Sequence, residues 1–336
     1  MHVWLRRFLL ALAAVPLLAL ATLGAVIVFD APSHPPTLAA GDTLPGIADW
    51  NRADIPPVRR VTARDGAPLA YRLYPGRPDR AIVLVHGSSG ASISMHKLAQ
   101  SLQSAGASVY SISLRGHGGS GTTNGDTSYK TQLDDDLVDF VKATGLADAG
   151  IRKTLAGFSS GGGFVLRTAA NANRLLFDDY LAISPYVGYD SPTARPNAGG
   201  WVSVAVPRIF ALTILDRSGL PLFQDLPVVR FATEAKASES RTPAYSYRLQ
   251  VGMQLGLDWR AAIGRIDRPL EVIVGSNDAL FVATEFKPLF ERLNPAIGVS
   301  VVQGPGHLDM IVDPVATRAI ATLWRRMAGN EAVPYR

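Results

Sequence analysis

Short apolar runs alternate with amphipathic stretches through most of the chain. Residues 81–85 (Ala-Ile-Val-Leu-Val) form the uninterrupted run required of a strand buried on both faces of a sheet. Residues 270–274 repeat this pattern with Glu271 as the single charged member. Earlier in the chain, the Asp65-Gly66 turn within residues 58–74 predicts a hairpin. Further strands are predicted for residues 108–114, for the segment ending at Phe158, and for residues 180–184 and 299–302.

The stretches between these strands have helical periodicity. In residues 128–144, the side chains of Leu133, Leu137, Phe140 and Val141 form one apolar stripe. Other helices are predicted to end near Ala105, Asn173, Leu293 and Met327. Strands that alternate with helices indicate an α/β fold with a mostly parallel central sheet and helices on both faces.

The alternation stops between residues 186 and 266. Prolines, glycines and aromatic residues are scattered there without a core-like strand. Because this segment is far longer than an ordinary loop, we expect a mainly helical cap or lid inserted into the core. A loop-rich extension of the core is the alternative. The expected α/β core therefore has a first part at 58–185 and a second part at 267–336.

The amino terminus is one long apolar run, without the alternation of strand-like and helix-like segments seen in the expected α/β core. Residues 8–29 are uncharged and follow Arg6 and Arg7. As a helix this run would span roughly 33 Å, close to the hydrocarbon core of a bilayer, and the preceding arginines favour export of the rest of the chain. We expect residues 1–29 to be a signal-anchor transmembrane helix, with the following domain on the periplasmic or extracellular side. Secretion after cleavage at Ala19-Leu20-Ala21 is the alternative. Proline-rich residues 30–57 are expected to be a linker or surface arm.

Composition narrows the possible chemistry. The 336 residues carry 33 basic and 28 acidic side chains, so the net charge is +5, and the basic residues form no run with interleaved aromatics. Nucleic-acid binding therefore has little support. The chain has no cysteine, which excludes disulfides, thiolate metal sites and a cysteine nucleophile. Asp134-Asp135-Asp136 would diverge around one helical turn, so we expect no metal site and no cofactor.

A glycine-flanked serine follows the predicted strand that ends at Phe158. The segment Gly157-Phe158-Ser159-Ser160-Gly161 fits the G-x-S-x-G pattern of a nucleophile elbow, a strained strand-to-helix turn. The glycines fix the frame, because centring the pattern on Ser160 would place Phe158 where a small residue is needed. The sequence therefore predicts Ser159 as a nucleophile.

An aspartate and then a histidine follow later predicted strands, both after Ser159 in the sequence. Asp278 comes after the strand at 270–274, and His307 after the strand at 299–302. Ser…Asp…His is the order of α/β-hydrolases. Asp190, which follows the strand at 180–184, is the competing acid. His86 is expected, with His117, to support loops by hydrogen bonding.

With these motifs the chain resembles the α/β-hydrolase superfamily, close to its monoacylglycerol lipase/lysophospholipase (serine aminopeptidase S33-like) branch. Ser113 and the loop Gly87-Ser88-Ser89-Gly90 depart from that branch's usual pattern. The matching segments are Val83-Leu84-Val85-His86-Gly87, Leu114-Arg115-Gly116-His117-Gly118, the elbow, Gly275-x-x-Asp278 and Gly304-x-Gly306-His307.

The resemblance implies the role of each residue. Ser159 would attack an acyl carbonyl, His307 would accept its proton, and Asp278 would orient the histidine. The backbone N–H groups of Ser88 and Ser160 would form the oxyanion hole. We expect a serine esterase that acts on a small-molecule ester or lipid, such as a monoacylglycerol or lysophospholipid. A serine peptidase, or an acyltransferase on the same triad, is the alternative.

Overall fold

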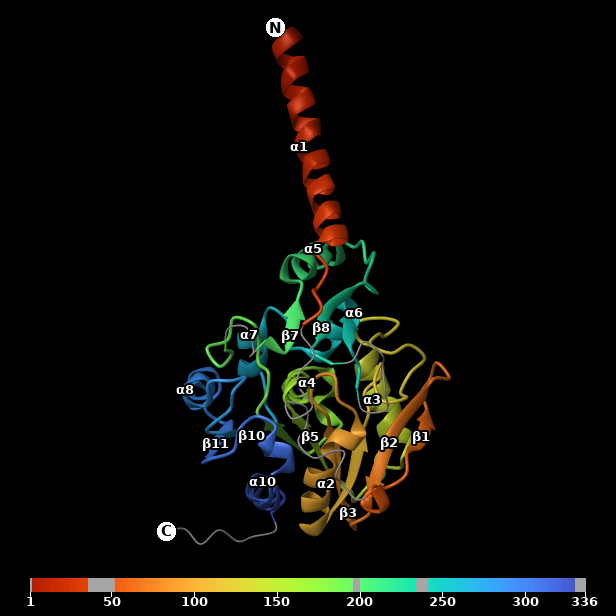
Figure 1. Ribbon diagram of the computed structural model, residues 1–336, viewed down its shortest axis with the longest axis vertical. Helices are drawn as coiled ribbons and strands as arrows, with labels where there is room; N and C mark the ends of the chain where they lie inside the picture. Colours follow the sequence, from red (N-terminus) through yellow and green to blue (C-terminus); the bar gives the residue numbers. More distant parts are fainter. Residues whose placement is uncertain (1, 36–51, 196–199, 234–240, 330–336) are drawn as a thin grey trace.

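The central feature of the computed structural model is an eight-stranded sheet covered by helices on both faces (Figure 1). The structure describes residues 2–35, 52–195, 200–233 and 241–329. The strand order is β1-β2-β4-β3-β5-β6-β10-β11. The strands are β1 (Arg59–Thr62), β2 (Pro68–Tyr74), β3 (Arg77–Val85), β4 (Ala107–Ile112), β5 (Arg152–Phe158), β6 (Asp179–Ile183), β10 (Leu270–Gly275) and β11 (Gly298–Val302).

The sheet is mostly parallel, as the sequence predicted. β1 and β2 form the expected antiparallel hairpin, and β2 also pairs antiparallel with β4. Every other neighbouring pair is parallel. The strands from β4 to β11 therefore bring their carboxyl ends to one edge of the sheet, where ligands gather in open α/β sheets. This is the α/β-hydrolase arrangement that the sequence analysis expected.

Helices connect the strands close to the predicted positions. The α-helices of the core are α2 (His96–Ser104), α3 (Gln132–Ala143), α4 (Ser160–Ala169), α8 (Ala283–Leu293), α9 (Asp309–Val312) and α10 (Pro314–Met327). Short 3-10 helices are η2 (Arg52–Asp54), η3 (Ser92–Met95) and η4 (Ala172–Leu175). The predicted helix ending near Asn173 is thus α4 followed by η4, with a break after Ala169.

The segment between β6 and β10 carries a cap above the carboxyl ends of the strands (Figure 1). Its helices are α5 (Val206–Arg217), α6 (Tyr247–Met253) and α7 (Trp259–Gly264). It also contains an antiparallel sheet of β7 (Val202–Val204), β8 (Pro227–Phe231) and β9 (Ala244–Ser246), which the sequence analysis did not predict. β7 and β9 have three residues each, too few for a periodic pattern to emerge.

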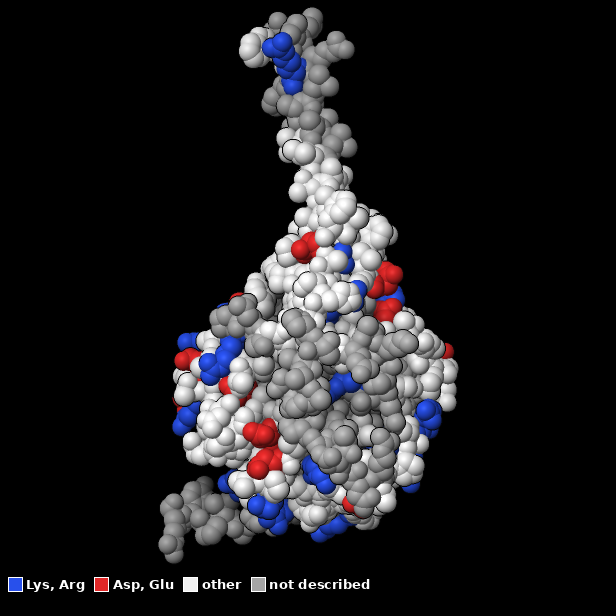
Figure 2. Space-filling view, in the orientation of Figure 1, with Lys and Arg blue, Asp and Glu red and all other residues white. Residues whose placement is uncertain are grey.

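Helix α1 (His2–Phe29) projects from the cap, and its base lies against α5 (Figure 1). Ile27 is buried there. The Arg208 guanidinium donates to the Val28 carbonyl at 3.1 Å, and the Arg208 amide donates to the Asp30 carboxylate at 2.9 Å. In Figure 2, basic atoms lie near the free end of α1, whereas mostly uncharged surface covers its lower part and the adjoining cap.

The structure gives no support to the predicted transmembrane span. Among the residues that it describes, no helix combines the length and the apolar character needed to cross a membrane. In α1 the described side chains are those of Trp4, Arg7, Val15 and residues 18–29. Of the predicted linker at 30–57, residues 36–51 lie outside the described part of the chain.

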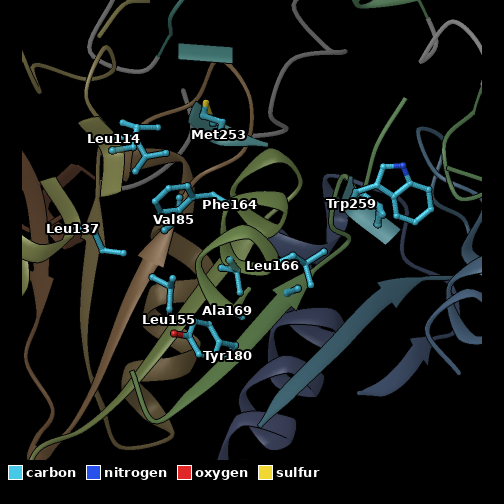
Figure 3. Packing of buried hydrophobic residues seen from close by; sticks show 14 of the residues in the cluster. Val85, Leu114, Leu137, Leu155, Phe164, Leu166, Ala169, Tyr180, Met253 and Trp259 are labelled. Atoms are coloured by element: carbon cyan, nitrogen blue, oxygen red, sulfur yellow. The ribbon is translucent and has the colours of Figure 1, made fainter. Parts of the chain in front are cut away.

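The central strands β3, β5 and β6 are buried on both faces. In β3, Val83 and Val85 pack in the cluster on the side of α3, α4 and α8, whereas Ile82 and Leu84 pack in the cluster on the side of α2 and α10. Figure 3 shows the first cluster, in which Phe164 of α4 lies close to Val85. This two-sided burial explains the uninterrupted apolar runs in the sequence and fixes the sheet that carries the site.

Candidate active site

Ser159 stands on a strained turn between β5 and α4. Its backbone has φ 57° and ψ −117°, a conformation that non-glycine residues rarely adopt. The flanking glycines make the turn possible. A Cβ at Gly157 would lie 2.3 Å from the Gly161 carbonyl oxygen, and a Cβ at Gly161 would lie 2.4 Å from the His86 carbonyl oxygen. The G-x-S-x-G pattern is therefore required by packing at this turn.

The structure brings Ser159, His307 and Asp278 into one hydrogen-bonded chain. The Ser159 Oγ lies 3.0 Å from His307 Nε2, and His307 Nδ1 lies 2.7 Å from Asp278 Oδ2. The three residues follow β5, β11 and β10, so the carboxyl edge of the sheet positions them together. All three are buried. The arrangement places a serine hydroxyl against an imidazole that a carboxylate orients, which is the geometry of nucleophile activation.

The Asp278 carboxylate is held in its ionised form. Burial would raise its pKa, but the hydrogen bond and charge of His307 and the amide donors of Phe281 and Leu280 outweigh burial and hold the pKa below its usual value. Those two amides donate to Oδ1 at 2.9 Å each, leaving Oδ2 for the histidine. Each carboxylate oxygen therefore has its own set of partners.

The competing acid, Asp190, is engaged elsewhere. Its carboxylate accepts hydrogen bonds from Trp259 Nε1 at 2.7 Å and from the Arg260 guanidinium at 2.9 Å. Asp309 instead accepts the Gly306 amide at 2.7 Å. In the described structure Asp278 is the carboxylate that contacts His307.

The two predicted oxyanion donors line the same cavity as Ser159. Ser160 is the first residue of α4, where an amide N–H has no partner within the helix. Ser88 lies in the turn Gly87–Gly90, which closes with the Gly90 amide donating to the Gly87 carbonyl at 3.1 Å. The Ser160 hydroxyl is buried without a hydrogen-bond partner among the described residues.

His86 and His117 support loops, as the sequence analysis expected. His86 Nδ1 lies 2.8 Å from the Gly87 carbonyl, and its Nε2 accepts the Leu114 amide at 3.2 Å. Burial lowers the pKa of His86 to about 4. Burial, and then the neighbouring His86 ring, lower the pKa of His117 as well. Both rings are therefore neutral near pH 7 and serve as fixed donor–acceptor pairs.

The three adjacent aspartates diverge as predicted. Asp134 pairs with Arg167, Asp135 with Arg64 and Asp136 with Arg115. The described residues contain no group of three or more potential ligands that could hold a metal ion. Asp136 is buried and forms a structural ion pair with the buried Arg115, which also pairs with Asp65.

Sequence reasoning missed one residue at the site, Tyr245. Its hydroxyl contacts both the Ser89 amide and His117 Nε2. Tyr245 belongs to β9 of the cap, and no local motif distinguishes it from the other aromatic residues of that segment. The contact joins residues 156 positions apart, which only the fold reveals.

A cavity of about 450 Å³ extends from Ser159 into the cap. Its walls are mainly apolar side chains from the cap, with Phe281 from the core. Members of this lining include Trp201, Ile209, Val229, Phe231, Val251 and Met253.

Comparison with known proteins identifies the family of this chain. The profile of the family described as "Serine aminopeptidase, S33" matches residues 76–307. The chain belongs to this family. The match runs from the start of β3 through the cap to His307, and it confirms the resemblance seen in the sequence. No curated protein sequence matches this S33 family member significantly.

Solved structures share the fold of this S33 family member at low sequence identity. A soluble variant of monoglyceride lipase from Saccharomyces cerevisiae is 18% identical with a TM-score of 0.62, over 83% of this chain and 97% of that chain. A putative aryl esterase from Burkholderia cenocepacia is 21% identical with a TM-score of 0.57, over 81% and 100%. A thermophilic esterase from Thermogutta terrifontis is 21% identical with a TM-score of 0.56, over 81% and 99%. These likenesses support the α/β-hydrolase fold.

Proposed function

We propose that this S33 family member is a serine hydrolase that cleaves carboxylic esters through an acyl-enzyme. The observation that carries the proposal is the hydrogen-bonded chain from Ser159 through His307 to Asp278. Ser159 Oγ attacks the ester carbonyl as His307 Nε2 takes its proton. His307 then returns the proton to the leaving alcohol, and Asp278 stabilises the imidazolium in between. Water then attacks the acyl-enzyme while His307 takes a proton from it. His307 passes that proton to Ser159 Oγ as the carboxylic acid leaves.

The oxyanion of the tetrahedral intermediate is assigned to two backbone donors. Ser160 and Ser88 both line the cavity that contains Ser159. Each well-placed donor is worth on the order of 3 kcal/mol in the transition state. The helix α4 starts at Ser160, so its dipole also favours negative charge at this point.

The apolar cavity supports an acyl lipid, such as a monoacylglycerol or lysophospholipid, as the substrate class. A cavity of about 450 Å³ with aliphatic and aromatic walls can bury an acyl chain, because removing that chain from water provides the binding energy. The rim of the cavity is also apolar and exposed, at Tyr189, Val204, Phe210 and Leu257. Such a rim fits an approach of the substrate from a lipid phase.

An aminopeptidase activity, suggested by the family's description, is the second enzyme class to test. A peptide amino terminus would need a free carboxylate in the pocket to pair with its ammonium group. The pocket carboxylates Asp190 and Asp216 are already paired, the first with Arg260 and the second with Lys130. Ester hydrolysis therefore fits the lining better than amino-terminal recognition does.

We propose further that the enzyme acts outside the cytoplasm, held at the membrane by its amino-terminal segment. The proposal rests on the apolar run at residues 8–29 and on the two arginines before it. Sequencing of the mature amino terminus in membrane and soluble fractions tests it. A soluble mature protein that begins near Thr22 would contradict retention at the membrane.

Labelling with a fluorophosphonate probe tests the nucleophile. Wild-type protein should be labelled and Ser159→Ala should not. Ser160→Ala is the matched control, because it removes a neighbouring hydroxyl and keeps the backbone donor; it should be labelled like the wild type. Equal labelling of Ser159→Ala and wild type would refute the assignment of Ser159.

A substrate profile tests the chemical class. We expect hydrolysis of monoacylglycerols, lysophospholipids and p-nitrophenyl esters, with kcat/KM rising with acyl length until the chain fills the cavity. Aminoacyl amides should be poor substrates. Faster cleavage of aminoacyl amides than of any ester would replace the esterase proposal with the peptidase one.

A further inference from the structure

The turn that carries Ser88 contains a strained residue. Ser89 has φ 61°, in the left-handed region that a non-glycine residue enters only at an energetic cost. Two hydrogen bonds hold it there. The Ser89 amide donates to the Tyr245 hydroxyl at 2.6 Å, and the Thr242 amide donates to the Ser89 carbonyl at 2.8 Å. Tyr245 belongs to β9 and Thr242 lies just before it, so the cap holds the turn in place.

The Tyr245 hydroxyl is the centre of a buried chain of hydrogen bonds. Because its oxygen accepts the Ser89 amide, its own proton is free to donate to His117 Nε2 at 2.7 Å. His117 Nδ1 then carries the ring proton and donates to the Arg115 carbonyl at 3.1 Å. Ser89, His117 and Tyr245 are almost fully buried. Burial lowers the pKa of His117, which keeps Nε2 available as an acceptor near neutral pH.

These hydrogen bonds determine which backbone amide of the turn Gly87–Gly90 is left to bind a ligand. The Ser89 N–H is occupied by Tyr245, and the Gly90 N–H by the Gly87 carbonyl. The Gly87 carbonyl, which shares a peptide plane with the Ser88 N–H, also accepts His86 Nδ1 at 2.8 Å. The peptide that bears the Ser88 donor is therefore fixed on one side by His86, and the next residue is fixed by Tyr245.

We propose that Tyr245 is a positioning residue of the cap that, through the Ser89 amide and with His117 as its acceptor, holds the Ser88 N–H in place to stabilise the oxyanion. The proposal rests on the proposed function, which assigns Ser88 as a donor. Tyr245 touches neither the substrate carbonyl nor the triad in this scheme. Its consequence is that the oxyanion hole is complete only while the β9 segment of the cap is seated on the core.

Kinetics of Tyr245→Phe with p-nitrophenyl butyrate test the proposal. The variant keeps the ring and removes the hydroxyl. We expect kcat to fall by roughly tenfold or more while KM changes by less than about twofold, because a misplaced oxyanion donor affects the transition state more than the bound ester. Tyr180→Phe is the matched control. It removes another buried tyrosine hydroxyl, bonded to the Arg174 carbonyl in the core, and should leave kcat near the wild-type value.

An alkyl trifluoromethyl ketone separates positioning from general loosening of the fold. Ser159 Oγ adds to its carbonyl carbon, the serine proton passes to His307, and the carbonyl oxygen becomes an oxyanion. Its affinity should weaken in Tyr245→Phe by about the same factor as kcat/KM. The matching alcohol, with CHOH–CH₃ in place of the trifluoromethyl ketone, forms no oxyanion. Its affinity should be the same for Tyr245→Phe and the wild type.

His117 provides a second, independent pair of variants. His117→Gln keeps an acceptor that can face the tyrosine hydroxyl, whereas His117→Ala removes it. We expect His117→Gln to retain more of the wild-type kcat than His117→Ala does. This pair decides the question if Tyr245→Phe does not fold, as judged by its melting temperature.

Two results would overturn the proposal. One is a folded Tyr245→Phe whose kcat and ketone affinity match those of Tyr180→Phe; the other is equal activity of the two His117 variants. Fluorophosphonate labelling keeps this failure distinct from failure of the proposed function. If wild-type protein is labelled at Ser159 and Tyr245→Phe is fully active, the positioning role is wrong and the serine hydrolase stands. If wild-type protein is not labelled, the proposed function fails first.

Discussion

At the scale of single residues, the carboxylate of Asp278 is defined by what surrounds it. One oxygen accepts two backbone amides and the other faces His307 Nδ1. An Asn side chain would keep its oxygen for the two backbone amides and would present its N–H₂ group to His307 Nδ1. The histidine would then adopt the tautomer that cannot accept the Ser159 proton.

We therefore expect Asp278→Asn to lower kcat for ester hydrolysis by roughly 10⁴-fold with little change in KM. Asp190→Asn is the matched control, because the Asp190 carboxylate bonds to Trp259 and Arg260, whereas His307 bonds to Asp278. Steady-state kinetics of both variants with one short-chain ester make the comparison. A larger loss of kcat in Asp190→Asn would show that the wrong acid had been assigned.

Buried neutral histidines make stability depend on pH. Burial lowers the pKa of His86 to about 4, below the value of 6.5 expected in the unfolded chain. The unfolded state therefore binds the proton first as the pH falls. Stability from this group is full above pH 6.5 and is lost as the pH falls towards about 4.

From His86 alone we expect the free energy of unfolding to fall by roughly 2 kcal/mol between pH 7 and pH 5. Urea denaturation at the two pH values measures it in the wild type and in His86→Gln. The variant is less stable overall but should lose about 2 kcal/mol less over this interval. The same loss in both proteins would mean that His86 does not carry this pH dependence.

At the scale of elements, the elbow depends on how closely α4 approaches the neighbouring strands. A Cβ at Gly161 would meet the carbonyl oxygens of His86 and Val85 at 2.4 and 2.8 Å. These atoms belong to the end of β3 and the residue after it, and they cannot rotate away as a side chain could. The helix that presents Ser159 therefore needs glycine at this position.

Gly161→Ala should lower the free energy of unfolding by about 1–3 kcal/mol and should lower kcat as well, because the helix start must shift. Gly264→Ala serves as the control: it lies in α7, and its nearest contact for a new Cβ is the Leu293 carbonyl at 3.5 Å. That substitution should be neutral or slightly stabilising. Thermal unfolding and ester kinetics of both variants test the expectation, which fails if the two alanine variants behave alike.

The α/β core and the positions of the candidate site residues could be predicted from the sequence because their signals are local. Ser159 directly follows β5, Asp278 and His307 lie in the loops after β10 and β11, and strands of a parallel sheet bring such positions to one edge. The hairpin at Asp65-Gly66 was also confirmed. Here chain order, strand pattern and glycine spacing all point to the same arrangement.

The cap could not be predicted in the same detail. β7 and β9 are three residues long, and they pair with β8 across loops. The contact of Tyr245 with Ser89 depends on that pairing and on the packing of β9 against Gly125, where an added Cβ would lie 2.1 Å from the Ala244 carbonyl oxygen. Such contacts carry no periodic signal, because they depend on where the elements meet in space.

At the scale of the whole molecule, the apolar rim of the cavity continues onto the outer face of the cap. Val206, Phe210 and Ile214 recur every fourth residue along α5, and all three are exposed. Leu222 and Phe223, which follow the helix, are more than half exposed. Helix α5 adjoins the base of α1 (Figure 1). If the enzyme takes its ester from a lipid phase, as proposed, this face should lie against the lipid.

The absence of cysteine from the chain makes this contact directly measurable. Single cysteines at Ile214 and Leu222, which lie outside the cavity lining, can each carry an environment-sensitive fluorophore in the full-length protein reconstituted with phosphatidylcholine vesicles. We expect blue-shifted emission and quenching by brominated lipids at both positions, since apolar side chains at an interface enter the acyl boundary.

Leu175 in η4 is the control: it is 70% exposed but precedes β6, at the opposite ends of the strands, and its label should report water. Each labelled protein should retain hydrolysis of a soluble short-chain ester, which confirms that it is folded. Water-like emission at Ile214 and Leu222 in active protein would mean that the cap face stays in solvent, and the ester would then have to reach Ser159 from the aqueous phase.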